Sequence, residues 1–475
     1  MKTKVPAKIK KHLPKKVWEI FKIYTHQGYE IYLVGAGVRN LLQEKAPIDC
    51  DLTTNAPPEV TQSLFDNSFY DNEFGMVGVP VKSGKNSQVY EITTFRTEWG
   101  YSDKRRPDQV RWGQDLEEDL KRRDFTWNAI VIGPHLKNKK WDKKSLIMID
   151  IFQGQKNFNH QLVRAVGNPK KRFNEDALRM MRAIRFAAQL GFQIESKTFE
   201  AIKQNADLIK HISAERIREE LFKLLGSNYP ADGYQLLDNS HLSSFILPEI
   251  KKMLGVNQKG PNRHHQDDVW SHAIKSLKAS RSKDPIVNLA ILIHDIGKPL
   301  TIGQDQRGNP TFYNHEVVGA SIAKNIARRL RFSKKDQEKI YQLVRWHQFS
   351  VDERQTDKAI RRFIRNVGQS NISDLLELRR ADRIGGGARE TSWRFERFKK
   401  KLIEVQKQPF SVTDLKINGR EVMKTLNLSP GPLIGKILNR LFKEVEDGQI
   451  KNEKKILLAQ VKKIKKDLSK LTKNT

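Results

Sequence analysis

Cysteine is nearly absent from this sequence, with Cys50 the only one among 475 residues. A single thiol excludes an intrachain disulfide, which fits a reducing compartment. No apolar run approaches the roughly 18 residues that a membrane helix needs. The basic N-terminal stretch lacks the apolar core of a secretory signal. We therefore expect a cytoplasmic protein with no membrane partner.

Acidic residues are scarce relative to basic ones. The chain has 55 Asp and Glu against 87 Lys and Arg, a formal net charge of +32. This excess favours a polyanionic partner such as nucleic acid, and a solubilising lysine-rich surface is the alternative. Internal repeats are lacking, and so are low-complexity segments beyond the lysine bias at both ends. The length exceeds what one core organises, so we expect about two to four domains.

The secondary-structure signals change character near residue 160. Helix signals before it lie at 17–24 and 38–43, and strand signals lie at 30–34, 77–81, 89–95, 110–112 and 129–132. The polar stretch 98–107 reads as a mobile loop because it carries Gly100 and Pro107. Beyond residue 160 almost only helical periodicity remains, as in 177–190, which stops at Gly191.

These signals predict an α+β protein with a small mixed sheet. We expect a mixed-sheet head at 1–160, a helical neck at 161–260, a histidine-rich helical domain at 261–400 and a basic helical tail at 401–475. Pro261 to His264 is the expected linker before the third domain, and Pro409 to Ser411 marks the last boundary.

The most informative stretch is the acid pair Asp49 and Asp51. In a strand both carboxylates would point to one face, and their repulsion would be relieved by a divalent cation, usually Mg²⁺ for oxygen ligands. The turn with Gly35 and Gly37 just upstream offers backbone N–H groups to phosphate. Together they indicate metal-assisted transfer from a nucleoside triphosphate. Two surface aspartates flanking a turn would give the same string.

Three further groups fit such a site. Glu91 lies in a run of β-branched residues and would supply a third carboxylate to the site. The alternative is that Glu91 is only a polar residue on a half-exposed strand. Arg123 and Asp124 suit a nucleotide's phosphate and ribose hydroxyl, or else form an ion pair at a helix start. Asp176 and Arg179, on the helix that also carries Arg182 and Arg185, are three apart, so they would read a base edge or form a surface pair.

A second site is indicated by histidines. His272, the pair His294 and Asp295, and the distant Asp382 follow the order of an HD metal site, and His315 and His347 would add ligands. Imidazoles and carboxylates on helices that hold a metal-bound water make a hydrolytic centre for phosphoesters. A structural helical domain with incidental histidines is the alternative.

The chain resembles the class II CCA-adding tRNA nucleotidyltransferases with an HD domain. The resemblance rests on ordered motifs at 33–42 and 48–52, 94–107, 115–129, 172–186 and 212–221. It implies CCA addition to the tRNA 3′ end from CTP and ATP, with tRNA as partner. The loop at 98–107 favours terminal A addition, because relatives that add only CC lack it. In such enzymes the HD domain is linked to phosphatase or phosphodiesterase activity, with a second divalent metal.

The resemblance also implies roles for the matching residues. Asp49 and Asp51 would bind Mg²⁺, with Glu91 as our inferred third catalytic carboxylate, and Arg39 would bind the triphosphate. Asp176 and Arg179 would pair with CTP or ATP in turn. The full nucleotide-binding set comprises Gly35, Gly37, Val38, Arg39, Arg123, Asp124, Asn128, Asp176, Arg179, Arg182 and Arg185.

Three positions depart from the family pattern, and rival functions stay open. Ala36 stands where the family usually has glycine, Asn40 where it commonly has aspartate, and the hinge near Gly154 is only partly kept. Alternatives are a bacterial poly(A) polymerase, an HD-type phosphohydrolase with an RNA-binding head, and a non-catalytic RNA-binding protein. Oligomeric state is not indicated by the sequence.

Overall fold

The structure is a computed structural model that describes most of the chain. The described residues are 2–71, 75–83, 86–100, 109–113, 115–137, 140–258, 267–349, 355–406, 412–447 and 449–471. The expected mobile loop at 98–107 and the linkers at 261–264 and 409–411 lie wholly or largely outside these ranges. Among the described residues, no helix has both the length and the apolarity needed to cross a membrane.

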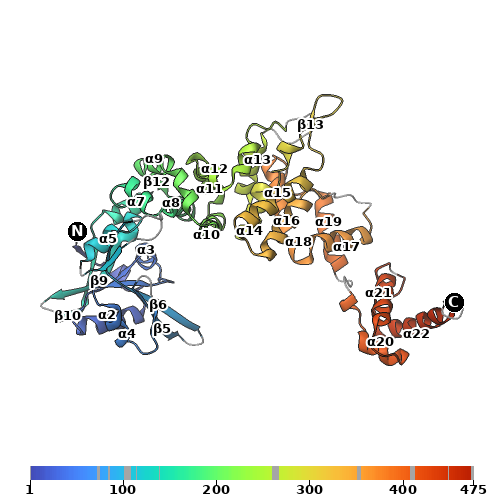
Figure 1. Cartoon of the computed structure of the whole chain (residues 1–475), viewed down its shortest axis with the longest axis horizontal. Helices are drawn as coiled ribbons and strands as arrows, with labels where there is room; N and C mark the ends of the chain where they lie inside the picture. Colours follow the sequence, from blue (N-terminus) through green and yellow to red (C-terminus); the bar gives the residue numbers. More distant parts are fainter. Residues whose placement is uncertain are drawn as a thin grey trace. The chain divides into compact units, whose positions relative to one another are not determined.

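The chain divides into two compact units. The first comprises Met1–Val256, Ser282–Leu289 and Asn325–Gln337, and the second comprises Asn257–Arg281, Ala290–Lys324 and Glu338–Thr475. Mixed sheet in the first unit and helices in the second confirm the predicted α+β class (Figure 1). The finer division into four domains stays a prediction.

The first unit is built on a mixed sheet with the strand order β1-β10-β9-β2-β3-β6-β5-β4. The pair β3 and β6 is parallel, and the other neighbours are antiparallel. The strands are β1 (Lys2–Lys4), β2 (Ile31–Val34), β3 (Asp51–Thr54), β4 (Phe69–Asp71), β5 (Met76–Ser83), β6 (Asn86–Thr94), β9 (Ile130–Lys137) and β10 (Lys140–Asp150). A separate hairpin joins β7 (Arg96–Trp99) to β8 (Gln109–Trp112).

Most of the predicted head elements are confirmed. The amphipathic stretch at 17–24 lies in α2 (Lys15–His26), whose Val17, Ile20 and Phe21 are buried. The strand signals at 30–34, 77–81, 89–95, 110–112 and 129–132 correspond to β2, β5, β6, β8 and β9. The sequence reading missed β10, a long strand rich in lysine at its start.

Helices follow the sheet in the first unit. Besides α2, the sheet region holds α1 (Ala7–Lys10), α3 (Ala36–Leu42), α4 (Pro58–Ser63) and α5 (Leu116–Lys121). The helices after the sheet are α6 (Gly154–Asn159), α7 (Pro169–Glu175), α8 (Leu178–Leu190), α9 (Ser196–Gln204), α10 (Ala214–Leu225), α11 (Pro230–Asn239) and α12 (Ser243–Ile246). Helix α8 stops where Gly191 adopts φ +70°, the left-handed cap expected of glycine. Tyr229 packs where a Cβ at that glycine would lie.

The second unit is helical apart from the two-residue strands β13 (Gly303–Gln304) and β14 (Pro310–Thr311). Its first helices are α13 (Val269–Ala279), α14 (Pro285–Ile293), α15 (His315–Arg329), α16 (Lys334–Trp346), α17 (Asp357–Val367), α18 (Ile372–Gly385) and α19 (Trp393–Gln406). Parts of α14, α15 and α16 are assigned to the first unit. Gly385 packs α18 closely against α13, because a Cβ there would lie 2.1 Å from Ser276 Oγ.

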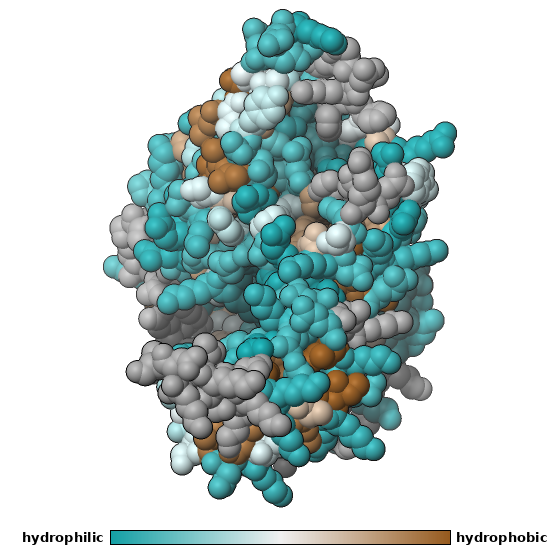
Figure 2. All heavy atoms as spheres, turned by 90° about the vertical axis from the view of Figure 1, so that its right-hand side faces the viewer, coloured by the Kyte–Doolittle hydropathy of each residue, from teal (hydrophilic) through white to brown (hydrophobic). Residues whose placement is uncertain are grey.

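The C-terminal helices have a hydrophobic cluster of their own. They are α20 (Gly419–Leu426), α21 (Pro432–Glu446) and α22 (Lys454–Leu471), and their apolar faces meet around Val422, Leu441 and Leu457. Figure 2 shows that hydrophilic residues dominate one face of the molecule, with apolar residues in small patches. This surface agrees with the lysine-rich composition.

Candidate functional sites

The glycine turn after β2 lies directly against the acid pair. Gly35 has φ +68°, and a Cβ there would lie 3.1 Å from Asp51 Oδ2. A Cβ at Gly37 would lie 3.2 Å from the carbonyl oxygen of Asp49. The backbone therefore approaches both aspartates at positions where only glycine leaves room. Val38 is fully buried, so its contact with a nucleotide stays a prediction.

The expectation that one strand carries both aspartates is wrong. Strand β3 begins at Asp51, and Asp49 lies in the bend before it. The reason is the partner strand, because β2 pairs Val34 with Asp51 and then turns away at Gly35. Asp49 is exposed, while Asp51 is partly buried.

The structure nevertheless gathers three carboxylates, which we call the acid cluster: Asp49, Asp51 and Glu91. Leu52 pairs with Ile92 across parallel strands and both are buried, so Asp51 and Glu91 lie on the opposite face at the same level. Burial, and then the charges of Asp49 and Glu91, raise the pKa of Asp51 to about 6. Such mutual repulsion fits a site for a divalent cation, whose charge would relieve it.

The acid cluster makes a prediction about the metal-free protein. The folded carboxyl of Asp51 holds its proton up to about pH 6, whereas an unfolded aspartate releases it near pH ~4, so its burial costs stability as pH rises through that window. Asp51→Asn should therefore raise the free energy of unfolding by about 1–3 kcal/mol at pH 7.5 in EDTA and by little at pH 4. Thermal unfolding of the metal-free protein at both pH values measures this.

Asp49→Asn is the matched control. Asp49 is exposed, so its replacement should raise the free energy of unfolding by less than Asp51→Asn does. An Asp51→Asn variant that is equally or less stable at pH 7.5 would contradict the repulsion described above.

A fully buried carboxylate that sequence reasoning missed, Asp119 on α5, organises the neighbouring arginines. Its Oδ1 accepts from Arg122 Nε and Nη2 at 3.0 and 2.6 Å, and its Oδ2 accepts from Arg123 Nη2 at 3.3 Å. Thr53 on β3 donates to the same Oδ2 at 3.4 Å. The two guanidiniums outweigh the burial and lower the pKa of Asp119. Arg123 is thereby fixed beside Asp51, whose charge it partly compensates.

We expect Asp119→Asn to weaken nucleotide binding more than it slows the chemical step. The variant leaves the partly buried guanidinium of Arg123 without this carboxylate, whereas Arg122 keeps Glu98 at 3.3 Å, so we expect a cost of about 1–3 kcal/mol of stability. KM for the nucleotides that the resemblance implies should rise about tenfold with a smaller change in kcat, because Arg123 loses its fixed position. Steady-state kinetics and thermal unfolding measure the two effects.

Glu117→Gln on the exposed side of the same helix serves as the control. Equal losses of kcat and kcat/KM with an unchanged KM would show that Asp119 does not act through binding.

Asp124 lies at the centre of a second buried network. It accepts from Arg182 Nε at 2.9 Å and from Asn128 Nδ2 at 2.9 Å. Burial alone would raise the pKa of Asp124, but these partners outweigh it and lower that pKa to about 2. Arg39 stacks nearby, with its guanidinium carbon 5.2 Å from the ring centre of Phe186. Asn128 lies beside Asp124 as predicted, and the structure adds Arg182 as a partner of Asp124 that the sequence reading did not give it.

The predicted pairing of Asp176 with Arg179 on one helix face is wrong. Helix α8 begins at Leu178, and Asp176 precedes it with φ −140°, accepting from the Leu178 N–H at 3.1 Å and from Arg216 at 3.2 Å. Arg179 instead donates to Glu175 Oε2 at 3.0 Å, a buried residue that sequence reasoning did not single out. Both side chains stay partly exposed, so a shared ligand remains our prediction.

The guanidinium of Arg185 is held by α10 and by the ring of Phe186. Its Nε donates to Glu220 on α10, its Nη1 donates to Gln189 at 2.8 Å, and its guanidinium carbon lies 3.8 Å from the ring centre of Phe186. The contacts join α8 to α10, which favours a structural role beside the predicted nucleotide contact.

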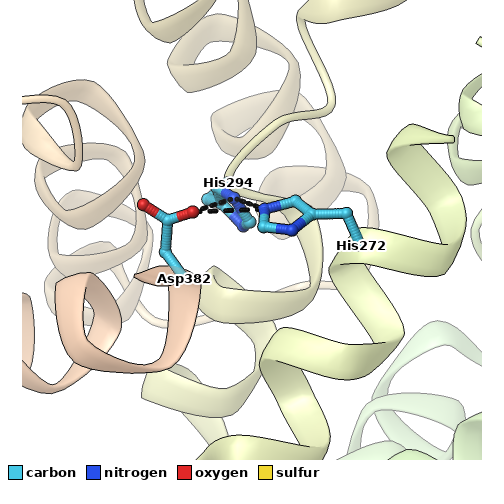
Figure 3. A group of neighbouring side chains, drawn as sticks. All are labelled: His272, His294 and Asp382. Atoms are coloured by element: carbon cyan, nitrogen blue, oxygen red, sulfur yellow. Dashed lines mark hydrogen bonds and ion pairs between the residues drawn. The ribbon is translucent and has the colours of Figure 1, made fainter. Parts of the chain in front are cut away.

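The second site is a buried cluster that we call the histidine centre: His272, His294, Asp295, His315, His347 and Asp382. Figure 3 shows His272, His294 and Asp382 converging from separate segments, with Nε2 of both imidazoles near Oδ1 of Asp382 at 3.1 and 3.6 Å. A second group is formed by Asp295, His315 and His347. The predicted four residues are brought together, and the two added histidines join them.

Asp295 lies between the two groups. Its Oδ2 is 3.2 Å from His294 Nε2 and 3.6 Å from His272 Nε2, and its Oδ1 is 3.3 Å from His315 Nε2 and 3.6 Å from His347 Nε2. One carboxylate thus faces both groups with different oxygens. That arrangement suits two cations bridged by Asp295.

The hydrogen bonds at the far side of the rings support metal ligation. Nδ1 of His294, His315 and His347 each lies 2.7 Å from a backbone carbonyl oxygen three residues earlier. With Nδ1 placed to donate to a carbonyl, Nε2 faces the cluster, where it can bind a metal ion that takes the place of a proton. Burial opposes a charged ring, but Asp295 and Asp382 outweigh it and raise the pKa of His294 to about 10. The centre therefore attracts a cation.

Comparison with known proteins identifies the family of the chain. Residues 31–164 match the poly A polymerase head domain, 191–254 a probable RNA and SrmB-binding site of polymerase A, and 316–461 a putative tRNA nucleotidyltransferase domain 2. The CCA-adding enzyme of Ligilactobacillus salivarius is 32% identical over 466 residues, covering 97% of this chain and 98% of that protein. The chain belongs to the CCA-adding enzyme family.

Other CCA-adding enzymes agree with this assignment. The protein of Lactobacillus helveticus is 45% identical over 268 residues, or 55% of this chain and 63% of its own. The crystal structure of the Bacillus stearothermophilus CCA-adding enzyme in complex with CTP has a TM-score of 0.64 at 25% identity, covering 98% of this chain and 100% of that one. The Thermotoga maritima enzyme complexed with tRNA shares the fold, with a TM-score of 0.60 at 18% identity.

Proposed function

We propose that this chain adds CCA to the 3′ end of tRNA, using CTP and ATP. The full-length similarity to CCA-adding enzymes carries the proposal, and the acid cluster beside Arg123 and Asp124 supports it. In the reaction the terminal hydroxyl oxygen of tRNA bonds to the α-phosphorus of the nucleotide, and the bond to pyrophosphate breaks. Such a transfer needs positioning and charge neutralisation more than covalent chemistry from the protein.

The acid cluster is the proposed Mg²⁺ site, because bound cations would relieve the repulsion among its three carboxylates. Bound there, a pair of magnesium ions would neutralise the charge that builds up on the phosphates. Asp49, Asp51 and Glu91 would hold the ions. The turn at Gly35 and Gly37 would leave room for phosphate, and Asp119 fixes Arg123 for the nucleotide.

Recognition of the ribose and the base is proposed for the residues around Asp124 and Arg179. Asp124, held ionised by Arg182 and Asn128, is placed to accept a hydrogen bond from a ribose hydroxyl. Asp176 and Arg179 are the proposed base-reading pair, with Glu175 holding the guanidinium of Arg179. The proposed domains are the head at 1–160, the neck at 161–260, the histidine-rich domain at 261–400 and the basic tail at 401–475. We propose that the shape of tRNA and contacts to its phosphates select it as substrate.

Stepwise addition tests the proposal. On tRNA that lacks its last three nucleotides, CTP alone should add two residues, and CTP with ATP should add three and stop. On tRNA ending in CC, ATP should add one residue. A long adenosine ladder would instead indicate the poly(A) polymerase alternative, and absence of any turnover would indicate an RNA-binding protein.

The histidine centre supports a second function, a metal-dependent phosphohydrolase. The observation that favours it is Asp295 facing two imidazole groups with its two oxygens. Four imidazoles with carboxylates suit a borderline transition ion better than Mg²⁺, so this metal should differ from that of the acid cluster. Bound metal would supply an activated water for hydrolysis of a phosphoester.

A further inference from the structure

Arg39 lies on the helix that follows the glycine turn, and two aromatic rings hold its side chain. It is in the last turn of α3, where its backbone N–H donates to the Gly35 carbonyl at 3.2 Å. Its guanidinium carbon lies 5.2 Å from the ring centre of Phe186 and 5.6 Å from that of Trp127, both within cation–π range. The two rings are nearly perpendicular, at 88°, with their centres 4.8 Å apart. We call Trp127 and Phe186 the aromatic corner.

The aromatic corner is assembled from two segments that are distant in the sequence. Trp127 belongs to the short 3₁₀ helix η1 (Thr126–Ala129), which closely follows Asp124, and Phe186 belongs to α8. Trp127 is fully buried and Phe186 is buried. Close packing keeps such rings in one orientation, so they fix the guanidinium that lies against them.

No carboxylate holds Arg39. Four other arginines of the predicted nucleotide-binding set are each bound by one: Arg123 by Asp119, Arg179 by Glu175, Arg182 by Asp124 and Arg185 by Glu220. Within the described ranges, Arg39 forms no ion pair and no side-chain hydrogen bond, and its printed contacts are with the two rings. A cation–π contact holds a guanidinium without a hydrogen-bond acceptor, so the five N–H donors of Arg39 are kept for a ligand.

The charge around Arg39 favours an anionic ligand. Burial, and then the charge of Arg185, lower the pKa of Arg39, although Asp124 and Asp51 act in the opposite direction. A guanidinium stays protonated at neutral pH, so its surroundings leave the charge of Arg39 only partly compensated. An anion bound there would lie close to the turn at Gly35 and to the acid cluster. The phosphate chain of a nucleotide fits that position, because it would contact both the guanidinium and the cations.

We propose that Trp127 and Phe186 are positioning residues for the triphosphate of the nucleotide, because they hold Arg39 in place by cation–π contact. The inference rests on the proposed nucleotide transfer and adds two residues that act through Arg39. A carboxylate in their place would occupy the donors and cancel the charge, and so would compete with phosphate. Because CTP and ATP share the triphosphate, the aromatic corner should serve both nucleotides equally.

Displacement of labelled CTP from the full chain in Mg²⁺ tests the inference without turnover. Trp127→Leu removes a ring that contacts Arg39, so the affinity for inorganic tripolyphosphate should fall about tenfold, while the affinity for cytidine stays unchanged. KM for CTP and for ATP should rise by the same factor, with a smaller change in kcat. Trp127→Phe should restore most of the affinity. The indole N–H has no hydrogen-bond partner in the described part of the chain, so this conservative variant breaks no hydrogen bond.

A double-mutant cycle separates positioning from packing. In an Arg39→Met background, Trp127→Leu should have little further effect on tripolyphosphate affinity, because the cation through which the ring acts is gone. Phe21→Leu, which alters a fully buried ring on α2, controls for the loss of packing and should lower the melting temperature without changing that affinity. If Trp127→Leu does not fold, the same cycle is run with Phe186→Leu, and Phe186→Tyr is then the conservative variant.

The outcomes separate the two proposals. Absence of CTP binding by the parent protein would refute the proposed nucleotide site, and the role of the aromatic corner with it. CTP binding by the parent with unchanged tripolyphosphate affinity in Trp127→Leu would keep nucleotide transfer and overturn the inference. Equal losses in the parent and Arg39→Met backgrounds would also overturn it, because the ring would then act through packing alone.

Discussion

Asp51→Asn should remove nucleotide addition to tRNA almost entirely, by about a thousandfold or more. The loss corresponds to several kcal/mol of charge stabilisation that divalent ions would supply at the proposed site during phosphoryl transfer. Asp51 has the raised pKa of a carboxylate crowded by Asp49 and Glu91, so its replacement weakens the cation site at its centre. Single-turnover extension of tRNA with saturating CTP measures the rate directly.

Two properties of the Asp51→Asn variant serve as controls for its loss of activity. The asparagine variant should be at least as stable as the parent without metal, so a loss of activity cannot come from unfolding. Hydrolysis of phosphoesters by the histidine centre should persist. Extension within about tenfold of the parent rate would remove Asp51 from the proposed site.

The reverse separation is expected from Asp295→Asn. Both imidazole groups lose the carboxylate that they share, so metal binding and phosphoester hydrolysis should fall by about a thousandfold, while CCA addition stays unchanged. The variant also leaves Lys298 buried without its partner, which should cost about 3–5 kcal/mol of stability. Metal content, hydrolysis and thermal unfolding are the measurements.

A double variant distinguishes lost function from lost stability. Asp295→Asn with Lys298→Met removes both members of the buried pair and should restore much of the stability without restoring metal binding. If the double variant recovers the metal, Asp295 does not bridge the two groups.

The sequence identifies residues whose signature is local. The glycine turn with its two following aspartates, and His294 followed by Asp295, each lie within one short segment, so spacing alone indicated them. Strand alternation also predicted that Glu91 would face the acids. These features need only the periodicity of one element and its neighbour.

Residues that act through distant partners could not be found in this way. Asp119 matters because the fold brings Thr53 of β3 and two arginines to one buried carboxylate. Lys298 matters because Gln258, forty residues earlier, meets it beside Asp295. Glu175 left a weak signal, since Arg172 and Arg179 lie three and four positions away and bind it.

The starting points of β3 and α8 explain why the predictions for the pair Asp49 and Asp51 and for the pair Asp176 and Arg179 are wrong. A spacing of two implies one strand face only while the strand continues, and β3 starts at Asp51 because its partner β2 ends at Val34. A spacing of three implies one helix face only inside a helix, and α8 starts after Asp176. Element ends are set by tertiary pairing, which the local pattern does not contain.

The most direct test is a crystal structure of the full chain with Mn²⁺ and a non-hydrolysable CTP analogue. Anomalous scattering locates manganese independently of the protein density. We predict anomalous peaks for manganese beside the carboxylates of Asp49 and Asp51. The triphosphate of the nucleotide should contact the manganese from the side opposite these carboxylates. Nucleotide bound in the head with both side chains turned away from it, and no manganese between them, would contradict the account.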